Sequence, residues 1–111
     1  MFGFGKKSVP EISVDDLKNI LEVEKCFLID VREPYEFAEG HIKTAVNIPL
    51  GELGEKVTAV VPDKSAHVYV NCRSGVRSVK ATQKLLDMGY ANTKNVEGGI
   101  LAWEKINPNC R

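Results

Sequence analysis

A strand, a loop and a helix are predicted in the stretch Val68-Tyr69-Val70-Asn71-Cys72-Arg73-Ser74-Gly75-Val76-Arg77-Ser78 and the residues that follow it. Residues 68–70 are β-branched or aromatic, and Asn71 follows them. Such a run is typical of a buried strand. From Ser78 on, apolar residues recur at helical spacing until Gly89, a residue that favours helix termination. The loop between them begins with Cys72 and wraps a helix N-terminus, where free N–H groups and the helix dipole favour a thiolate. We therefore predict a nucleophilic cysteine.

Strands and helices alternate along the rest of the chain. Strands are expected at residues 26–31, 45–48, 68–71 and 94–96, and helices near 14–21, 35–39, 50–60, 78–88 and 100–106. The alternation predicts an α/β domain with a mainly parallel sheet. The almost continuous apolar run at residues 26–31 indicates a strand that helices cover on both faces.

Polar and glycine-rich residues follow the predicted strands. In a parallel sheet the carboxyl ends of the strands meet at one edge, which is where ligands bind. The segments expected at that edge are residues 30–33, 49–50, 72–77 and 97–99. Cys72 falls in the middle of them.

Composition limits the partners of this protein. Its 111 residues suit one domain, expected at residues 9–107 between tails at 1–8 and 108–111. Fifteen basic and fifteen acidic residues cancel, so no overall charge draws the chain to nucleic acid or to a membrane. No apolar run is long enough to span a bilayer, and the start lacks the apolar region of a signal peptide.

The three cysteines are scattered. Their number and spacing suggest neither a disulfide framework nor a metal site, so a reducing cytoplasm is the expected location. Cys26 lies within an apolar segment and is interpreted as a core residue. Cys110 is near the end of the chain and is expected to be exposed.

Gly75 and two serines are expected to shape the surroundings of the Cys72 thiol. Gly75 allows a positive φ, so that successive N–H groups can turn inward and form an anion-binding nest. The hydroxyls of Ser74 and Ser78 can donate to the thiolate. Ser78 can equally serve only as the N-cap of the helix, and the sequence leaves both alternatives open.

The two arginines of the loop have different expected roles. Arg73, early in the loop, is expected to point outward and to face the substrate. Arg77 is either an oxyanion clamp or the structural partner of an acid such as Asp30 or Glu33, and we favour the structural role. No acidic residue interrupts this basic segment, which gives the loop a local preference for anions.

Other polar residues near the expected edge have structural interpretations. Asp30 and Arg32 are expected to form an ion pair that braces the loop, and Glu36 is a further candidate for that network. His41 is interpreted as structural, because a thiolate stabilised by a nest needs no general base. Trp103 is expected in the core.

The spacing of Cys72 and Arg77 restricts what the loop can hold. Phosphatase loops have the pattern Cys-x5-Arg, in which seven residues ring a phosphate, whereas Arg77 follows Cys72 in a Cys-x4-Arg pattern and position 78 is serine. A tighter ring fits a smaller group on the sulfur, such as a single sulfane atom. A cysteine-based phosphatase or arsenate reductase is therefore a minor alternative.

The segment Cys72–Ser78 resembles the active-site loop of rhodanese-type sulfurtransferases in their single-domain form. Further stretches that resemble this family are residues 28–33, 35–42, 45–49 and 97–103, so that the resemblance spans about residues 11–106 in the family's order. It implies a rhodanese-like fold with a five-stranded parallel sheet flanked by helices on both faces. No cofactor and no metal are expected.

The resemblance further implies a sulfur-transfer reaction at Cys72. The cysteine would attack the sulfane sulfur of an anionic donor such as thiosulfate, expel sulfite and hold a persulfide. Cyanide in the assay, or a thiol or protein cysteine in the cell, would then accept the sulfur. The family's loop assigns anion binding to Arg73, Ser74, Gly75, Val76, Arg77 and Ser78. A monomer or weak dimer is expected.

The alternative from another functional class is a catalytically silent interaction module. Inactive relatives of this kind typically lose the loop cysteine, and here Cys72 is present with Gly75 and the basic residues of the loop. The sequence therefore favours the enzyme.

Overall fold

A computed structural model describes residues 8–108 of the chain. Its elements, in order, are β1 (Glu11–Ile12), α1 (Val14–Val23), β2 (Phe27–Asp30), α2 (Pro34–Glu39), β3 (Val46–Asn47), the 3-10 helix η1 (Leu50–Glu52), α3 (Leu53–Val60), β4 (Val68–Asn71), α4 (Arg77–Asp87), β5 (Thr93–Val96) and α5 (Gly99–Ile106). The predicted tails at residues 1–8 and 108–111 lie, apart from Ser8 and Pro108, outside the described residues.

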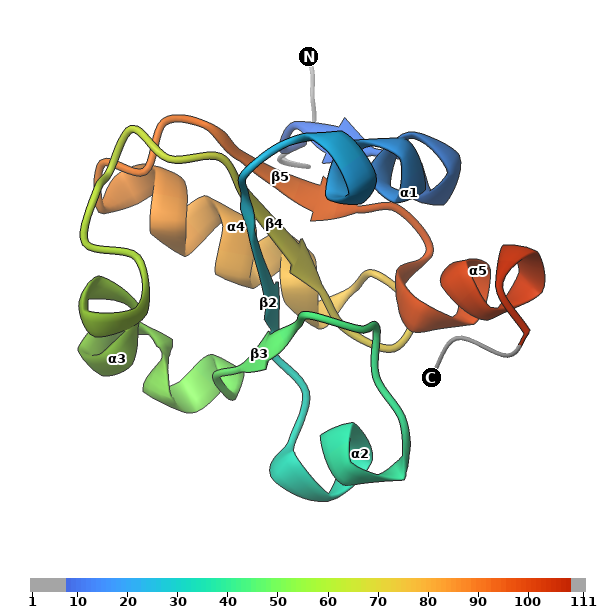
Figure 1. The fold of residues 1–111 in the computed structure, drawn as a ribbon. Coiled ribbons are helices and arrows are strands. Elements are labelled where there is room, and N and C mark those ends of the chain that lie inside the picture. Colours follow the sequence, from blue (N-terminus) through green and yellow to red (C-terminus); the bar gives the residue numbers. More distant parts are fainter. Residues whose placement is uncertain (1–7, 109–111) are drawn as a thin grey trace, which may run out of the picture.

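The strands form one parallel sheet in the order β1-β5-β4-β2-β3. Phe27 of β2 pairs with Val68 of β4, and Val70 of β4 pairs with Asn95 of β5. Strand β4 lies at the centre of the sheet (Figure 1). Its carboxyl end therefore lies in the middle of the edge at which the carboxyl ends of all the strands meet. The predicted five-stranded parallel sheet is confirmed.

Helices cover both faces of the sheet (Figure 1). Leu28 and Tyr69 belong to the core cluster that α1 and α5 cover, whereas Ile29 and Val70 belong to the cluster beneath α3 and α4. Successive residues of β2 and β4 thus point into different apolar layers, which explains why their sequences read as continuous apolar runs. The predicted two-sided covering is confirmed.

The helices begin and end where local chemistry directs. The Ser13 hydroxyl accepts a hydrogen bond from the N–H of Asp16 at 3.1 Å and caps α1. Pro34 occupies the first turn of α2, and Gly40 ends that helix. Gly89 follows α4 with a φ of +100°, which only glycine adopts without strain.

Most elements differ from the predicted ranges by one or two residues at an end, and the helix predicted at residues 50–60 is divided into η1 and α3. Strand β1 was not predicted from the apolar pattern, because two residues are too few to show a period. Strand β2 begins at Phe27, so Cys26 lies just before it and is half-buried against the α1 and α5 cluster. Within residues 8–108, no helix is long and apolar enough to span a bilayer.

Candidate active site

Cys72 lies directly after β4, with only 1% of its surface exposed. The loop after it turns at Gly75, whose φ is +101°, and enters α4 at Arg77. This turn brings backbone donors back to the thiol: the N–H of Gly75 lies 3.1 Å from the sulfur, and the N–H of Ser78 lies 3.4 Å from it. The loop is thus a nest whose donors converge on the Cys72 sulfur.

Ser78 also contributes its side chain. The Ser78 hydroxyl donates to the Cys72 sulfur at 3.3 Å, and Ser78 is fully buried. The N-cap position of α4 belongs to Val76, which makes no side-chain capping bond. Of the two alternatives for Ser78, the structure therefore favours the donor. Ser74, an exposed residue, acts on the sulfur through its backbone N–H.

These donors decide the charge of the thiol. Burial, the largest single cause, raises the pKa of Cys72, because a buried thiolate loses its hydration. The hydroxyl and N–H of Ser78 and the N–H groups of Gly75 and Ser74 lower it by more in sum, so the pKa of Cys72 is lowered overall. The groups that lower the pKa of Cys72 most are thus neutral hydrogen-bond donors.

The first turn of α5 holds the loop from the other side. The N–H of Ile100 donates to the carbonyl of Cys72 at 2.9 Å, and the N–H of Leu101 donates to the carbonyl of Arg73 at 3.1 Å. The backbones approach so closely that a Cβ on Gly99 would lie 2.5 Å from the Arg73 carbonyl oxygen. The glycines at 98–99 were predicted at this edge, but their part in fixing the loop was missed.

Arg77 pairs with an acid on α2. Its Nη1 lies 2.7 Å from Oε1 of Glu36, and its Nη2 lies 3.0 Å from Oε2, which makes a two-pronged ion pair. The hydrogen bonds from Arg77, above all, lower the pKa of Glu36 to about 2. Arg77 thus has a structural partner, but it is Glu36 and not Asp30 or Glu33.

Asp30 and Arg32 form a second ion pair, in which Nη2 of Arg32 lies 2.8 Å from Oδ2 of Asp30. Both residues are buried, and the same nitrogen donates to the carbonyl of Gly40 at 2.8 Å. The pair ties the end of α2 to the edge of the sheet. It does not touch Cys72 directly, so its effect on the loop is indirect.

The remaining candidates divide between the loop surface and the core. Arg73 and Val76 are exposed on the loop. His41 stacks on Phe37 with ring centroids 3.6 Å apart, and its Nδ1 lies 2.8 Å from the Phe37 carbonyl oxygen, which agrees with a structural role. Trp103 is buried in the core, as predicted.

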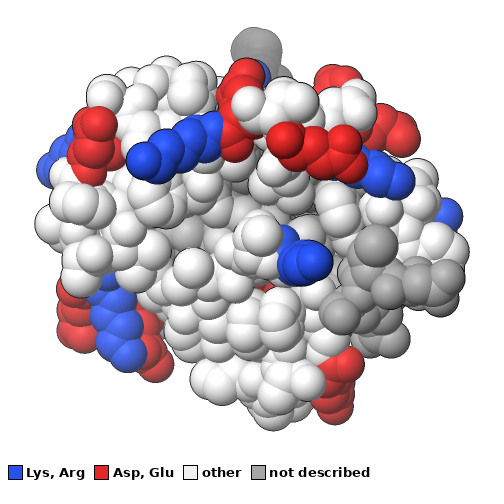
Figure 2. Space-filling view, viewed as in Figure 1, with Lys and Arg blue, Asp and Glu red and all other residues white. Residues whose placement is uncertain are grey.

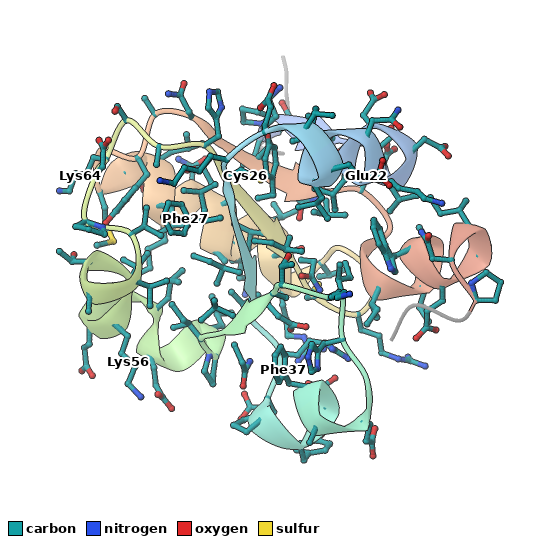
Figure 3. The ribbon with its side chains drawn as sticks, in the orientation of Figure 1. Glu22, Cys26, Phe27, Phe37, Lys56 and Lys64 are labelled. Atoms are coloured by element: carbon teal, nitrogen blue, oxygen red, sulfur yellow. The ribbon has the colours of Figure 1, made fainter. Side chains whose placement is uncertain are left out.

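Cys26 lies at the far end of the sheet from Cys72. It precedes the amino end of β2, whereas Cys72 follows the carboxyl end of the parallel strand β4. Five residues of strand separate the two levels, which is about 16 Å at the rise of a β-strand. In Figure 3, Cys26 lies in the upper part of the view, and Phe37, on α2, lies in the lower part. Cys26 therefore cannot form a disulfide with Cys72. Cys110 lies outside the described residues.

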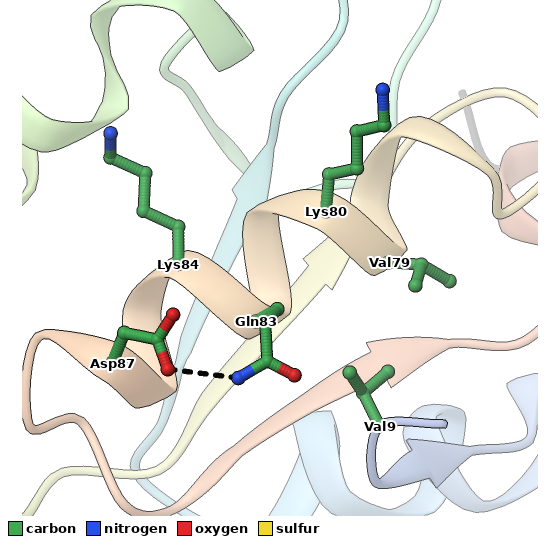
Figure 4. Close-up of a pocket in the computed structure, with 6 residues that line it drawn as sticks. All are labelled: Val9, Val79, Lys80, Gln83, Lys84 and Asp87. Atoms are coloured by element: carbon green, nitrogen blue, oxygen red, sulfur yellow. Dashed lines mark hydrogen bonds between the residues drawn. The ribbon is translucent and has the colours of Figure 1, made fainter. Parts of the chain in front are cut away.

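Surface charge and cavities add little to the site. Figure 2 shows most acidic and basic side chains around the margins of one face, with a basic side chain near its centre and mostly uncharged surface elsewhere. A cavity of about 340 Å³ lies along the outer side of α4 (Figure 4) and is lined by Val9, Val79, Lys80, Gln83, Lys84 and Asp87. None of the predicted site residues lines it.

Among residues 8–108, no group of His, Cys, Asp or Glu side chains has the arrangement of a metal site.

Comparison with protein families decides the classification. The model of the Rhodanese-like domain matches residues 13–106, which is most of the chain. The chain belongs to the rhodanese-like family. YtwF of Bacillus subtilis is 45% identical over 97 residues, which cover 86% of this chain and 91% of that protein. A sulfurtransferase of Allochromatium vinosum is 34% identical, with 87% of this chain and 90% of that protein covered.

Solved rhodanese structures share the fold. The human single-domain sulfurtransferase TSTD1 superposes with a TM-score of 0.79 at 28% identity, and the match covers 88% of this chain and 97% of that one. The relatives include other activities: a tRNA uridine(34) hydroxylase of Buchnera aphidicola is 30% identical over 83% of this chain and 31% of that protein. The sulfurtransferases among the relatives support a rhodanese-type sulfur transfer for this chain.

Proposed function

We propose that this rhodanese-like domain is a thiosulfate sulfurtransferase in which Cys72 carries the sulfur as a persulfide. The observation that carries the proposal is the ring of donors around the Cys72 sulfur, which lowers the pKa of the thiol although the residue is buried. A thiolate in such a nest is a ready nucleophile for a sulfane sulfur.

The reaction divides into two displacements. The Cys72 thiolate attacks the outer sulfur of thiosulfate; a new S–S bond forms, the old S–S bond breaks, and sulfite leaves with the electron pair. Cyanide then attacks the outer sulfur of the persulfide, thiocyanate forms, and the thiolate returns. The same N–H and O–H donors that hold the thiolate can hold the terminal sulfur anion of the persulfide. Ping-pong kinetics are expected.

The donor is proposed to be a small anion. Arg73 is exposed on the loop that starts at Cys72. Its guanidinium can therefore attract an anionic donor from solution. The backbone N–H groups supply the remaining anion recognition. Thiosulfate combines a transferable sulfane sulfur with two negative charges and fits both features.

The acceptor must come from outside the described part of the chain. Cys26 is out of reach of Cys72, so the persulfide is not resolved there as a disulfide. A thiol or a cysteine of another protein is the proposed acceptor in the cell. Thiol acceptors persist in a reducing compartment, for which we propose the cytoplasm, with the chain as a monomer or weak dimer.

The phosphatase and arsenate reductase alternatives receive no support from the site. Both terminal nitrogens of Arg77 are occupied by Glu36 and not turned toward the loop centre. An interaction module without activity would have no use for the buried thiol and the donors that surround it.

The test is the transfer of sulfur from thiosulfate to cyanide, followed as thiocyanate. The wild-type chain and Cys26→Ser are expected to turn over at similar rates, and Cys72→Ser is expected to be inactive. Turnover that survives in Cys72→Ser would contradict the proposal. Inactivity of the wild type with thiosulfate, polysulfide and mercaptopyruvate alike would favour the interaction module.

A further inference from the structure

Arg77 belongs to the loop around the reactive sulfur, but its guanidinium is bound to Glu36. Arg77 is the first residue of α4, one position before Ser78, which donates to the Cys72 sulfur twice. Its two terminal nitrogens nevertheless donate to the carboxylate of Glu36. The two guanidinium nitrogens that could bind an anionic donor are thus already bound to the Glu36 carboxylate of α2.

Glu36 is itself fixed before it meets Arg77. Its Oε1 accepts a hydrogen bond from the N–H of Glu33 at 2.9 Å, as part of the capping box of α2. The end of α2 is tied to the sheet edge through the bond from Arg32 to the Gly40 carbonyl. The Glu36 side chain is only 15% exposed, against 37% for Arg77. The position of the Glu36 carboxylate is therefore fixed by α2, and Glu36 in turn fixes the position of the Arg77 guanidinium.

This pairing has an electrostatic consequence at the sulfur. The pKa of Arg77 is raised by Glu36 first and also by the charges of Cys72 and Asp30, which places its cation within electrostatic range of the thiolate. The Glu36 carboxylate contacts both terminal nitrogens of Arg77 and so offsets this positive charge. The donors that lower the pKa of Cys72 most are neutral groups.

We propose that Glu36 is a positioning residue that sets donor selectivity: by holding the Arg77 guanidinium, it withholds one positive charge from the donor site and limits the preference for dianionic donors. The inference rests on the proposed sulfur transfer. It predicts that loss of the Glu36 charge increases the reactivity of Cys72 toward anions. A brace without an electrostatic role would have no such effect.

The direct test compares two alkylating agents of nearly equal size, neutral iodoacetamide and anionic iodoacetate. Their rates at Cys72 are measured by mass spectrometry of the Cys72 peptide, which separates this thiol from Cys26 and Cys110. In Glu36→Gln the iodoacetate-to-iodoacetamide rate ratio is expected to rise about fivefold, the size of one unit charge nearby at high effective dielectric constant. Glutamine keeps the shape of the side chain and an acceptor for the Glu33 N–H.

Further variants separate a charge effect from loosening of the loop. Glu55→Gln removes an equal charge from the exposed surface of α3 and is expected to leave the ratio unchanged. The double variant Glu36→Gln with Arg77→Gln is expected to return to the wild-type ratio, because the pair is removed together. If Glu36→Gln changes both rates by the same factor, Glu36 is only a structural brace and the inference is wrong.

Sulfur donors then connect the charge effect to the proposed function. Loading of Cys72 is compared for thiosulfate, a dianion, and methanethiosulfonate, a monoanion that would release methanesulfinate in the same displacement. Glu36→Gln is expected to shift the thiosulfate-to-methanethiosulfonate rate ratio upward, again about fivefold. Loading in the wild type with no shift in the variant would overturn the inference alone. Failure of the wild type to load would overturn the proposed function, while the alkylation ratio still decides whether Glu36 withholds the charge.

Discussion

The hydroxyl of Ser78 lies 3.3 Å from the sulfur of Cys72, and both residues are almost completely buried. The two side chains come from consecutive elements, with Cys72 after β4 and Ser78 in the first turn of α4. With 1% and 0% of their surfaces exposed, Cys72 and Ser78 have little contact with water. The hydroxyl therefore supports the charge of the sulfur more strongly than an exposed serine would.

Replacement of Ser78 by alanine is expected to raise the pKa of Cys72 by about one unit, because one hydrogen bond to a charged group is lost. The thiolate fraction at neutral pH falls accordingly. The measurement is the pH dependence of iodoacetamide reaction at the Cys72 peptide, whose midpoint should move to higher pH. Ser74→Ala is the matched control, because Ser74 acts through its backbone N–H. An equal shift in both variants would contradict the assignment.

The Glu36–Arg77 pair is expected to make the protein sensitive to acid. The pKa of Glu36 falls from its usual 4.5 to about 2 in the folded chain. Because the folded value is the lower one, the pair stabilises the fold above pH 4.5, and this contribution is lost as the pH falls toward 2. Its size is on the order of 1–2 kcal/mol, since the side chain of Arg77 is more than a third exposed.

Urea unfolding of the wild type and Glu36→Gln measures this contribution. The difference in unfolding free energy between the two is expected to be largest near neutral pH and to shrink by about half at pH 3. A difference that is the same at both pH values would show that the carboxylate charge contributes nothing to stability.

Gly99→Ala is expected to damage the loop from the side of α5. Gly99 has a φ of +59°, and an added Cβ would lie 2.5 Å from the Arg73 carbonyl oxygen and 2.6 Å from that of Cys72. We expect a loss of at least about 2 kcal/mol in unfolding free energy and slower alkylation of Cys72. Gly51→Ala is the control: nothing lies within 4 Å of its added Cβ. Wild-type stability and reactivity in Gly99→Ala would show that the close approach is not needed.

Arg73→Gln is expected to raise the KM for thiosulfate about fivefold with little change in kcat, because an exposed cation attracts the donor without touching the reacting sulfur. Lys18→Gln, which removes an exposed charge from α1, should leave KM unchanged. An unchanged KM in Arg73→Gln would transfer donor recognition to the backbone N–H groups.

The sequence predicts those helices and strands that are long enough to show an apolar pattern, or whose ends carry a capping or helix-breaking residue. The apolar runs at β2 and β4 require two buried faces, and Gly89, Pro34 and Ser13 mark helix ends through their own backbone or side-chain chemistry. The convergence of the strand ends on Cys72 follows from the parallel order of the strands. These features are local or follow from general rules of sheet topology.

What the patterns leave out depends on contacts between distant segments. Glu36 and Arg77 are 41 positions apart, and only the orientation of α2, fixed by its capping box and by Arg32, selects Glu36 over Asp30 and Glu33. Strand β1 owes its existence to pairing with β5 and not to its own two residues. The hydrogen bonds from α5 to the carbonyls of Cys72 and Arg73 likewise depend on a close backbone approach at Gly99. A glycine in the sequence allows such an approach but does not show which segment lies beside it.

The central claim is that Cys72 carries the transferred sulfur, and intact-protein mass spectrometry tests it most directly. The reduced wild-type chain is incubated with thiosulfate beside Cys72→Ser. We expect the wild type to gain the mass of one sulfur atom, to lose it with cyanide as thiocyanate forms, and Cys72→Ser to gain nothing. Equal loading of the two chains, or no loading of the wild type from any sulfane donor, would contradict the claim.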